Sequence, residues 1–600
     1  MYDIWTAARK RLTANRILTI WLLGIVGVYL FFWYQQAALS GWCNDEAAHI
    51  PSGLYTLQTG LTDAYRVNPH LPRVIAAIPL QFFEAETSWY LRRSPFDRIE
   101  FTFANDWVRK DLSAIPRLLL VCRSTNLLFV LVGLLSIGRW AYCLYGPRAA
   151  WVACASWVLN PDILVHSAAV GPDLPAASAG LMMGYSYWNW MVQKERSFPW
   201  WVAVCVAFAT LCKFSWLFLF FALPAVTLVF DFLARRGSKA LIEHEARPNK
   251  QPLSFYQDSI RLGLSFSLAV LLINAVYGFG GSFSCLGDFR FISQSLTGGK
   301  LAIDGTGNRF VEGAFANLPV PLPSDMLLGI DFLRWEFESG MESYLCGRWN
   351  YGGWWYFYLY AMAVKMPLGY WLLIGLGIGS LIWDRLRKKP VAQLEWLPLL
   401  LAVMFIALIS SQTGFTHHVR YVLPAYGFLF ILASRVMVVF PKRIAFTLVA
   451  VCLSGTIWFH TTHLGLAHTF FNPLAGGPNN GWRHLSFSNV DWGQSTYRMV
   501  DWVKEHPQQR PMTVLFVSSL GRPEQLVADQ KNVFTSAAWR QARNDEYASP
   551  TRSGFYLISS FQMTLPQNRF FWDQKPIDQP RPDMLLFYLS EDDVAGFQSR

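Results

Sequence analysis

Long apolar runs recur through the first 460 residues, and they constrain the fold more than any other feature of this chain. A helix rises about 1.5 Å per residue, so about 20 apolar residues cross the roughly 30 Å hydrocarbon core of a bilayer. The runs lie near residues 17–34, 115–137, 148–160, 174–192, 199–212, 214–233, 260–279, 366–383, 396–411, 421–438 and 443–460. We therefore expect a polytopic α-helical membrane protein with about 11 transmembrane helices, of which the short runs 148–160 and 199–212 could be tilted pieces or half-helices.

The composition supports this class and excludes others. Charged residues make up 15% of the chain, against about 25% in ordinary soluble domains. The 53% of apolar residues exclude a disordered chain, and nine cysteines in 600 residues do not make a disulfide scaffold. The first run is longer than the core of a typical signal peptide, although Ala38 and Ser40 could mimic a cleavage site.

Basic residues predict the orientation of the helices. Every second connection between runs is short and rich in lysine and arginine, which is typical of cytoplasmic loops. These connections and the N-terminus carry Arg9, Lys10, Arg11, Arg16, Arg139, Arg148, Lys194, Arg196, Arg235, Arg236, Lys239, Arg247, Lys250, Arg385, Arg387, Lys388, Lys389, Lys442 and Arg443. The protein should therefore lie in the cytoplasmic (inner) membrane with its N-terminus on the cytoplasmic side. Because this pattern accounts for much of the net charge of +11, a nucleic-acid partner is the weaker explanation.

The long connections then fall on the outer side. Residues 1–460 should form the membrane domain, with external loops at 36–114 and 280–354. Residues 461–600 should form an external α/β domain, because a helical stretch near 491–505 precedes short apolar runs at 512–518, 554–560 and 584–590 that are typical of strands. Cys285 and Cys346 in the second external segment could pair, or both could remain free thiols.

Acidic residues on the outer side are the candidates for chemistry. On a helix, Asp45 and His49 would share a face one turn apart, so Asp45 could act as a general base or bind a metal. Glu46 would point elsewhere and could serve as a structural partner. The alternative is an acidic helix N-terminus followed by a solvated turn. Asp173 starts the fourth run, where an acid should face a cavity or cap the next helix.

Four basic residues on the same side could bind an anion. Arg73 precedes a stretch, 74–83, that suits a helix lying in the membrane interface. Lys213, Lys365 and Arg420 interrupt or begin later apolar runs near the outer face. Cations there suit a phosphate at headgroup depth, although each one alone could be a simple interfacial anchor.

Taken in order, these motifs resemble GT-C glycosyltransferases, in particular protein O-mannosyltransferases and lipid A aminoarabinose transferases. The resemblance extends over about residues 40–505 and departs from the family pattern at Ala47, at 70–73 and at Pro172. The matching segments are Asp45-Glu46 with His49, Asn68-Pro69 with Pro72, Asp173, Cys212-Lys213-Phe214, 365–369, 420–424 and the sequence SNVDWGQ at 488–494.

The resemblance implies an enzyme that moves a sugar from a polyprenyl-phosphate carrier to a hydroxyl or amine of a protein, lipid or glycan acceptor, with inversion at the anomeric carbon. It implies catalytic roles for Asp45, Glu46 and Asp173, with Asp45 as the base. It assigns the donor phosphate to Arg420, Lys365, Arg73 and Lys213, and orientation of an acceptor or metal to His49, His418 and Tyr421. No cofactor is required, and a divalent Mg²⁺, Mn²⁺ or Zn²⁺ held by Asp45, Asp173 and His49 is left open.

Three other functions remain open at this point. A polymerase or ligase of the same class would hand over a whole glycan. A secondary transporter would carry buried charges near the midplane of the membrane, often in repeated halves. A non-catalytic envelope scaffold would tolerate the loss of the Asp45 carboxylate.

Overall fold

The computed structural model describes residues 23–83, 89–103, 115–193, 198–236, 255–388, 393–516, 526–527, 529–535 and 552–598. Several of the basic residues that predict the orientation lie outside the described residues, at 9–16, 194–196, 239–250 and 389. The predicted start of the first apolar run, at residue 17, lies outside them as well.

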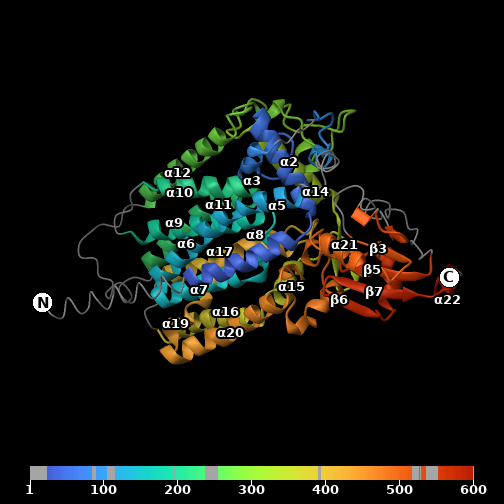
Figure 1. Ribbon diagram of the computed structural model, residues 1–600. Helices are drawn as coiled ribbons and strands as arrows, with labels where there is room; N and C mark the ends of the chain where they lie inside the picture. The colour runs from blue at the N-terminus through green and yellow to red at the C-terminus, as the bar shows by residue number, and fades with distance from the viewer. Residues whose placement is uncertain are drawn as a thin grey trace.

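The apolar runs form helices that pack side by side in an elongated bundle (Figure 1). Their bounds agree with the predicted runs to within a few residues, except that the second run extends to residue 145. The helices are Leu23–Leu39, α5 (Ile115–Ser124), α6 (Asn126–Tyr145), α7 (Pro147–Leu159), α9 (Asp173–Val192), α10 (Trp200–Cys212), α11 (Leu219–Arg236), α12 (Phe255–Val276), α16 (Leu368–Leu386), α17 (Leu397–Ser410), α18 (Leu423–Ala433) and α20 (Lys442–Thr462).

Among the described residues, three helical stretches are long and apolar enough to cross a membrane: Ile115–Tyr145, Val419–Val439 and Lys442–Thr462. A fourth span is formed only if α15 (Phe357–Lys365) and α16 count together, and these two helices bend by 113° at their break. Pro367 lies in this break, where proline disfavours a continuous helix. The expected number of about 11 full spans is therefore not confirmed, because among the described residues only these stretches are both long and apolar enough, and six further apolar helices have 10–17 residues.

Close packing against Trp216 fixes the position of α9, the helix that begins with Asp173. A Cβ atom on Gly180 of α9 would lie 2.0 Å from the ring of Trp216, so only glycine admits this ring. The Trp216 indole also donates to the carbonyl of Ala176 at 3.0 Å. Because Trp216 follows Lys213 by three residues, this contact places Lys213 beside the start of α9.

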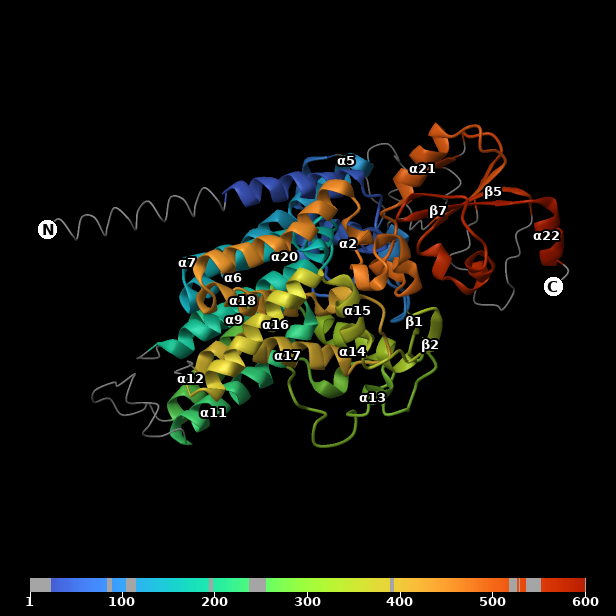
Figure 2. The same cartoon turned by 90° about the horizontal axis from the view of Figure 1, so that it is seen from below.

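The long connections that we expect to be external gather at one end of the bundle, next to the C-terminal sheet (Figures 1 and 2). They contain α2 (Asn44–Thr59), α3 (Leu71–Ala77), the 3₁₀ helix η1 (Ile78–Phe82), α14 (Ser324–Ser339) and the hairpin of β1 (Glu342–Leu345) and β2 (Arg348–Tyr351). The predicted interfacial stretch at 74–83 is thus α3 continued by η1. Cys285 and Cys346 are both free thiols.

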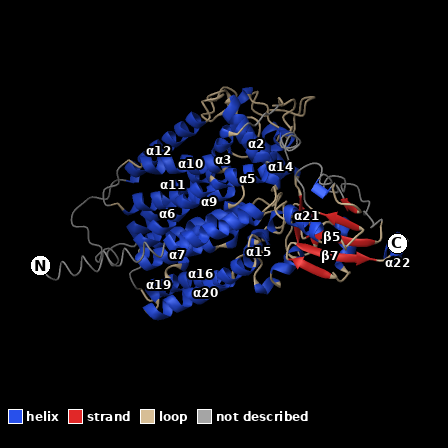
Figure 3. Cartoon of the chain, in the orientation of Figure 1, coloured by secondary structure: helices blue, strands red, loops and turns tan. Residues whose placement is uncertain are grey.

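The tail forms α21 (Thr496–Glu505) and a five-stranded sheet (Figure 3). The strand order is β4-β3-β5-β7-β6, in which β3 is parallel to β4 and β5, and β7 is antiparallel to β5 and β6. The strands are β3 (Met512–Leu515), β4 (Val533–Thr535), β5 (Gly554–Ser559), β6 (Asp578–Arg581) and β7 (Met584–Leu589). The three predicted strand runs are β3, β5 and β7, and the predicted helix is shorter than expected because residues 491–495 form a turn before it.

Candidate active site

Asp45 lies in the first turn of α2. Its carboxylate oxygen Oδ2 is 2.7 Å from Nη2 of Arg420, which comes from the 3₁₀ helix η6 (Val419–Val422) at the start of α18. The Asp45 side chain is 24% exposed, whereas that of Arg420 is 6% exposed. Two residues 375 positions apart in the sequence therefore form an ion pair whose carboxylate remains accessible.

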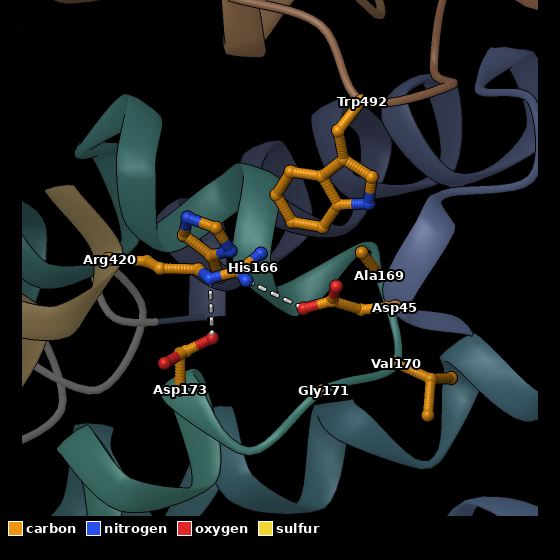
Figure 4. A pocket seen from close by; sticks show the side chains of 8 residues that line it. All are labelled: Asp45, His166, Ala169, Val170, Gly171, Asp173, Arg420 and Trp492. Atoms are coloured by element: carbon orange, nitrogen blue, oxygen red, sulfur yellow. Dashed lines mark ion pairs between the residues drawn. The ribbon is translucent and has the colours of Figure 1, made fainter. Parts of the chain in front are cut away.

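Arg420 also contacts a second carboxylate. Its Nε is 3.2 Å from Oδ2 of Asp173, and the ammonium of Lys213 pairs with the other oxygen of Asp173. Figure 4 shows the Arg420 guanidinium between the two aspartates. The four residues alternate in charge as Asp45, Arg420, Asp173 and Lys213, so the formal charges of the row sum to zero.

The surroundings make Asp45 a stronger base than an exposed aspartate. Burial raises the pKa of Asp45, and the Arg420 charge offsets only part of this rise. A carboxylate with a raised pKa accepts a proton more readily, and its remaining exposure gives a reactant access to it. The arrangement can therefore perform general base catalysis.

A small cavity lies against this row of charges (Figure 4). Its wall consists of Asp45, His166, Ala169, Val170, Gly171, Asp173, Arg420 and Trp492. The space not filled by atoms is about 210 Å³, with the open mouth included. Burial lowers the pKa of His166 to about 3, so His166 is neutral at physiological pH and offers a hydrogen bond rather than a charge.

Glu46 does not share the position of Asp45. It is fully buried and forms two contacts with Arg123, at 2.8 Å and 2.6 Å. The amides of Cys43 and Val170 donate to the same carboxylate. Because helical residues one position apart point in different directions, Glu46 faces the protein interior when Asp45 faces the cavity. The structure therefore places Glu46 in a buried ion pair and not beside Asp45 at the cavity.

Arg73 lies near Asp45 without joining the row of charges. His49, one turn after Asp45, contacts the ring of Tyr65 at 4.8 Å, and the Arg73 guanidinium lies 5.1 Å from the centre of the same ring. Arg73 is 2% exposed, and its Nε and Nη1 have no hydrogen-bond partner among the described residues. Buried nitrogens of this kind are costly unless an anion or water satisfies them.

Two further predicted site residues, Lys365 and His418, contact the C-terminal part of the chain. Lys365 donates to the carbonyls of His468 and Asn489, both at 2.9 Å, and its ammonium faces the ring of Phe471. Nδ1 of His418 pairs with the hydroxyl of Ser488 at 2.7 Å. Both side chains are thus engaged by the chain after residue 461, and the ring of His418 also contacts that of Tyr421 at 5.3 Å.

Tyr421 lies next to the row of charges. The ammonium of Lys213 lies 4.5 Å from the centre of its ring, and the Arg420 guanidinium lies 5.7 Å from it. Its ring also stacks on Phe415. Tyr421 therefore supports both cations through its aromatic face.

The proposed metal ligands do not form a metal site. Asp45 and Asp173 both point at Arg420, whose positive charge occupies the place between them, and His49 faces Tyr65. Within the described ranges, no three His, Cys, Asp or Glu side chains cluster so that they could hold a metal ion. These residues do not fit a divalent cation, and the chemistry below needs none.

The sequence did not single out His166, Trp492 or Arg123 as site residues. His166 and Trp492 were visible only as members of longer motifs, at 160–173 and 488–494. Arg123 lies inside an apolar stretch, where it resembles an interfacial anchor. A charged residue in such a stretch indicates a buried ion pair, since a buried arginine needs an acidic partner.

The chain matches no family model and no curated protein. Among solved structures it is similar to ArnT from Cupriavidus metallidurans bound to undecaprenyl phosphate, at 12% identity and a TM-score of 0.41, over 95% of this chain and 98% of that one. It is also similar to the apo state of the same protein, at 12% identity and a TM-score of 0.43, over 95% and 97% of the two chains.

A further similar structure is the apo oligosaccharyltransferase from Archaeoglobus fulgidus. Here the identity is 10% and the TM-score 0.43, over 86% of this chain and 64% of that one. Similarity at these levels assigns no activity to this chain.

Proposed function

We propose that this chain is a membrane glycosyltransferase that moves a sugar from a polyprenyl-phosphate carrier to an acceptor hydroxyl or amine on the outer side of the cytoplasmic membrane. The observation that carries the proposal is the accessible Asp45 carboxylate at the edge of a cavity, held by a buried arginine. The apolar helix bundle suits a lipid-linked donor, and the order of the motifs along the chain suits this enzyme class.

Asp45 acts as the general base in this proposal. The acceptor oxygen or nitrogen attacks the anomeric carbon from the face opposite the phosphate, and Asp45 takes the proton that the acceptor loses. The bond between the anomeric carbon and the phosphate oxygen breaks, and its electron pair leaves with the phosphate. A single displacement inverts the anomeric centre, so a second carboxylate nucleophile is not needed.

The distribution of charge favours Arg73 as the residue that binds the donor phosphate. Arg420 and Lys213 are already neutralised by Asp45 and Asp173, so an added phosphate would have to break their ion pairs. Arg73 has no acid within ion-pair distance among the described residues and keeps two unsatisfied nitrogens. A guanidinium with two free donors binds a phosphate in a bidentate manner.

Arg420 has a different role in this scheme. It holds Asp45 and Asp173 at fixed positions and keeps the Asp45 carboxylate turned toward the cavity. As Asp45 becomes protonated, the positive charge of Arg420 is less compensated, and this charge then favours the departure of the phosphate. Asp173 keeps the guanidinium oriented through the cycle.

The test is sugar transfer in liposomes that contain purified protein and radiolabelled polyprenyl-phosphate sugars. We expect Asp45→Asn to lower the transfer rate by about 10²- to 10⁴-fold, as for the loss of a general base. Asp63→Asn is the matched control, because Asp63 belongs to the same connection, 36–114, its carboxylate accepts a hydrogen bond from Tyr55 at 3.0 Å, and it does not line the cavity. Full transfer by Asp45→Asn would remove the proposed base.

The same assay separates the other functions. Transfer of one sugar indicates a single-sugar transferase, whereas transfer of an oligosaccharide indicates a polymerase or ligase of this class. Movement of a labelled solute across the liposome membrane without any transfer would favour a transporter. Asp45 and Asp173 lie in the first turns of α2 and α9, and Arg420 lies at the start of α18, which argues against the midplane site of a transporter.

A further inference from the structure

Residues 488–495, here called the bridging segment, contact both loops that carry the central ion pair. On the Arg420 side, Oδ1 of Asn489 accepts from the amide of Val419 at 2.8 Å, and Nδ2 donates to the carbonyl of His417 at 2.6 Å. The hydroxyl of Ser488 pairs with His418. The three residues before Arg420 are thus held by one short stretch of the tail.

The same segment pairs with the loop before Asp45. The amide of Asn44 donates to the carbonyl of Trp492 at 3.0 Å, and the amide of Gly41 donates to the carbonyl of Gln494 at 2.9 Å. The two backbones approach so closely that a Cβ atom on Gly493 would lie 2.2 Å from the carbonyl oxygen of Trp42. Gly493 also has a φ of +122°, which side chains rarely adopt.

Trp492 places an aromatic ring directly at the ion pair. The Arg420 guanidinium lies 4.6 Å from the centre of its ring, and His166 stacks on the ring at 5.6 Å. On the Asp45 side the ring packs with Cys43 and Ala169. Figure 4 shows Trp492 above the cavity, with Arg420 and His166 beside it.

Two anchors hold the bridging segment in place. Lys365 donates to the carbonyl of Asn489 from the bundle side. From the sheet side, the hydroxyl of Ser495 donates to Oδ2 of Asp583 at 2.8 Å, and Asp583 lies in the turn between β6 and β7. His468 contacts the same oxygen at 3.3 Å. Asp583 is fully buried, so this contact is part of the packed interface between the sheet and the bundle.

We propose that the bridging segment is a positioning device for the active site: it joins the loops of Asp45 and Arg420, the C-terminal sheet anchors it through Asp583, and Trp492 is the positioning residue for the Arg420 guanidinium. This inference extends the proposed function, since the residues that it positions are those assigned to sugar transfer. It gives the C-terminal sheet a part in building the catalytic site. It also gives Lys365 a structural task in place of phosphate binding.

The first test separates the bridging segment from the Asp45 loop. Gly493→Ala places a methyl group against the Trp42 carbonyl. Gly477→Ala is the matched control, because Gly477 also has a positive φ, of +75°, but has open space around it. Alkylation of Cys43, followed by mass spectrometry of its peptide, reports the separation, because Cys43 is 1% exposed and packs against Trp492.

We expect Gly493→Ala to raise alkylation of Cys43 severalfold, whereas Gly477→Ala leaves it unchanged. Cys122 and Cys212, which are fully buried, should stay protected in both variants. Unchanged protection of Cys43 in Gly493→Ala would overturn the proposal. Equal exposure of all three cysteines would overturn it too, because the contact would then support the whole chain rather than the site. Alkylation of Cys43 is measured without substrate, so this test can succeed or fail independently of whether the protein transfers a sugar.

The second test acts through the anchor in the sheet. Asp583→Asn keeps the shape of the side chain and removes its charge, and Asp578→Asn on the exposed part of β6 is the control. We expect Asp583→Asn to lower kcat by about 10²-fold, as for a small misplacement of catalytic groups, with KM for the polyprenyl-phosphate sugar unchanged. Trp492→Phe, which keeps an aromatic face, should retain more activity than Trp492→Leu. A rise in KM with kcat unchanged, or equal activity of the two Trp492 variants, would contradict the positioning role.

Discussion

The contacts of Arg420 depend on the shape of its guanidinium and not only on its charge. It contacts Asp45 through Nη2 and Asp173 through Nε, and its flat face lies against Trp492. A lysine ammonium is a compact point charge and cannot repeat this fork and stacking. We therefore expect Arg420→Lys to lower kcat by about 10²- to 10³-fold, similar to the loss of one preorganised electrostatic contact.

The control for this substitution is Arg435→Lys. Arg435 also lies between two acids, at 3.0 Å from Asp384 and 3.5 Å from Glu395, but at the far end of α18. Initial rates of sugar transfer by the two variants decide the question. If Arg435→Lys slows the reaction as much as Arg420→Lys does, the effect is one of helix packing and not of the site.

The pH dependence of the reaction follows from the environment of Asp45. Since burial raises the pKa of Asp45, the carboxyl stays protonated to a higher pH than an ordinary aspartate, and it is a base only above that pKa. The rate of transfer should therefore rise with pH on the acidic side, with a midpoint above the ordinary aspartate value of about 4. A pH profile of kcat/KM measures this midpoint, and a midpoint at or below about 4 would contradict the assigned environment.

At the scale of elements, the buried pair of Glu46 and Arg123 joins α2 to α5. Arg123 also donates to the carbonyls of Ala37, Ser40 and Gly41, so it holds the chain that leads into Asp45. Removing one partner leaves a buried charge without compensation, which costs about 3–5 kcal/mol. We expect Glu46→Gln to lower the thermal unfolding temperature in detergent markedly, and the double variant Glu46→Gln/Arg123→Met to recover part of the loss. A double variant less stable than Glu46→Gln would contradict this account.

The elements themselves were largely predictable, because helix length and strand length follow from runs of apolar residues. The bundle helices and β3, β5 and β7 lie where those runs are. The break between α15 and α16 follows from Pro367, but its angle of 113° does not, since the angle depends on packing against other helices. Long-range partners such as Arg123 and Asp583 were not predictable, because nothing in the sequence near either residue identifies an acid or hydroxyl 77 or 88 positions away.

At the scale of the whole molecule, the sheet and the bundle meet at a group of buried ionisable residues. Burial, and then the Asp583 carboxylate, raise the pKa of Asp491 to about 7, although the amides of Gly493 and Ser495 act against this shift. His468 and Arg498 face Asp583 in the same group. In the unfolded chain Asp491 titrates near 3.8, so the folded protein binds the extra proton between about pH 4 and 7.

Stability should therefore fall as the pH rises through this range, because the folded state loses a proton that the unfolded state has already lost. Asp491→Asn keeps the oxygen that accepts from Gly493 and Ser495 and removes the charge. We expect this variant to unfold at a higher temperature than the wild type above pH 7 and to show a flatter dependence between pH 5 and 8. Thermal unfolding at a series of pH values measures both, and parallel curves for the two proteins would contradict the assignment.

The location of the site was predictable because orientation and chain order place Asp45, Asp173, Lys213 and Arg420 near one face, and the structure brings these four together. The roles of the basic residues were less predictable, because a cation that already forms an ion pair with an aspartate is not available to bind a phosphate. Lys365 has the same sequence context as Lys213, but it is held by backbone carbonyls of the tail. Only the fold shows that the tail reaches it.

The central claim is that Asp45 and Arg420 act as one unit in sugar transfer, and a double-mutant cycle tests it most directly. Transfer rates from a labelled polyprenyl-phosphate sugar are compared for the wild type, Asp45→Asn, Arg420→Gln and the double variant. If the two side chains form one catalytic unit, the double variant is about as slow as the slower single variant. If the decreases in transfer rate of the two single variants multiply in the double variant, the two side chains act independently. In that case, or if Asp45→Asn transfers sugar at the wild-type rate, the ion pair is not the centre of the reaction.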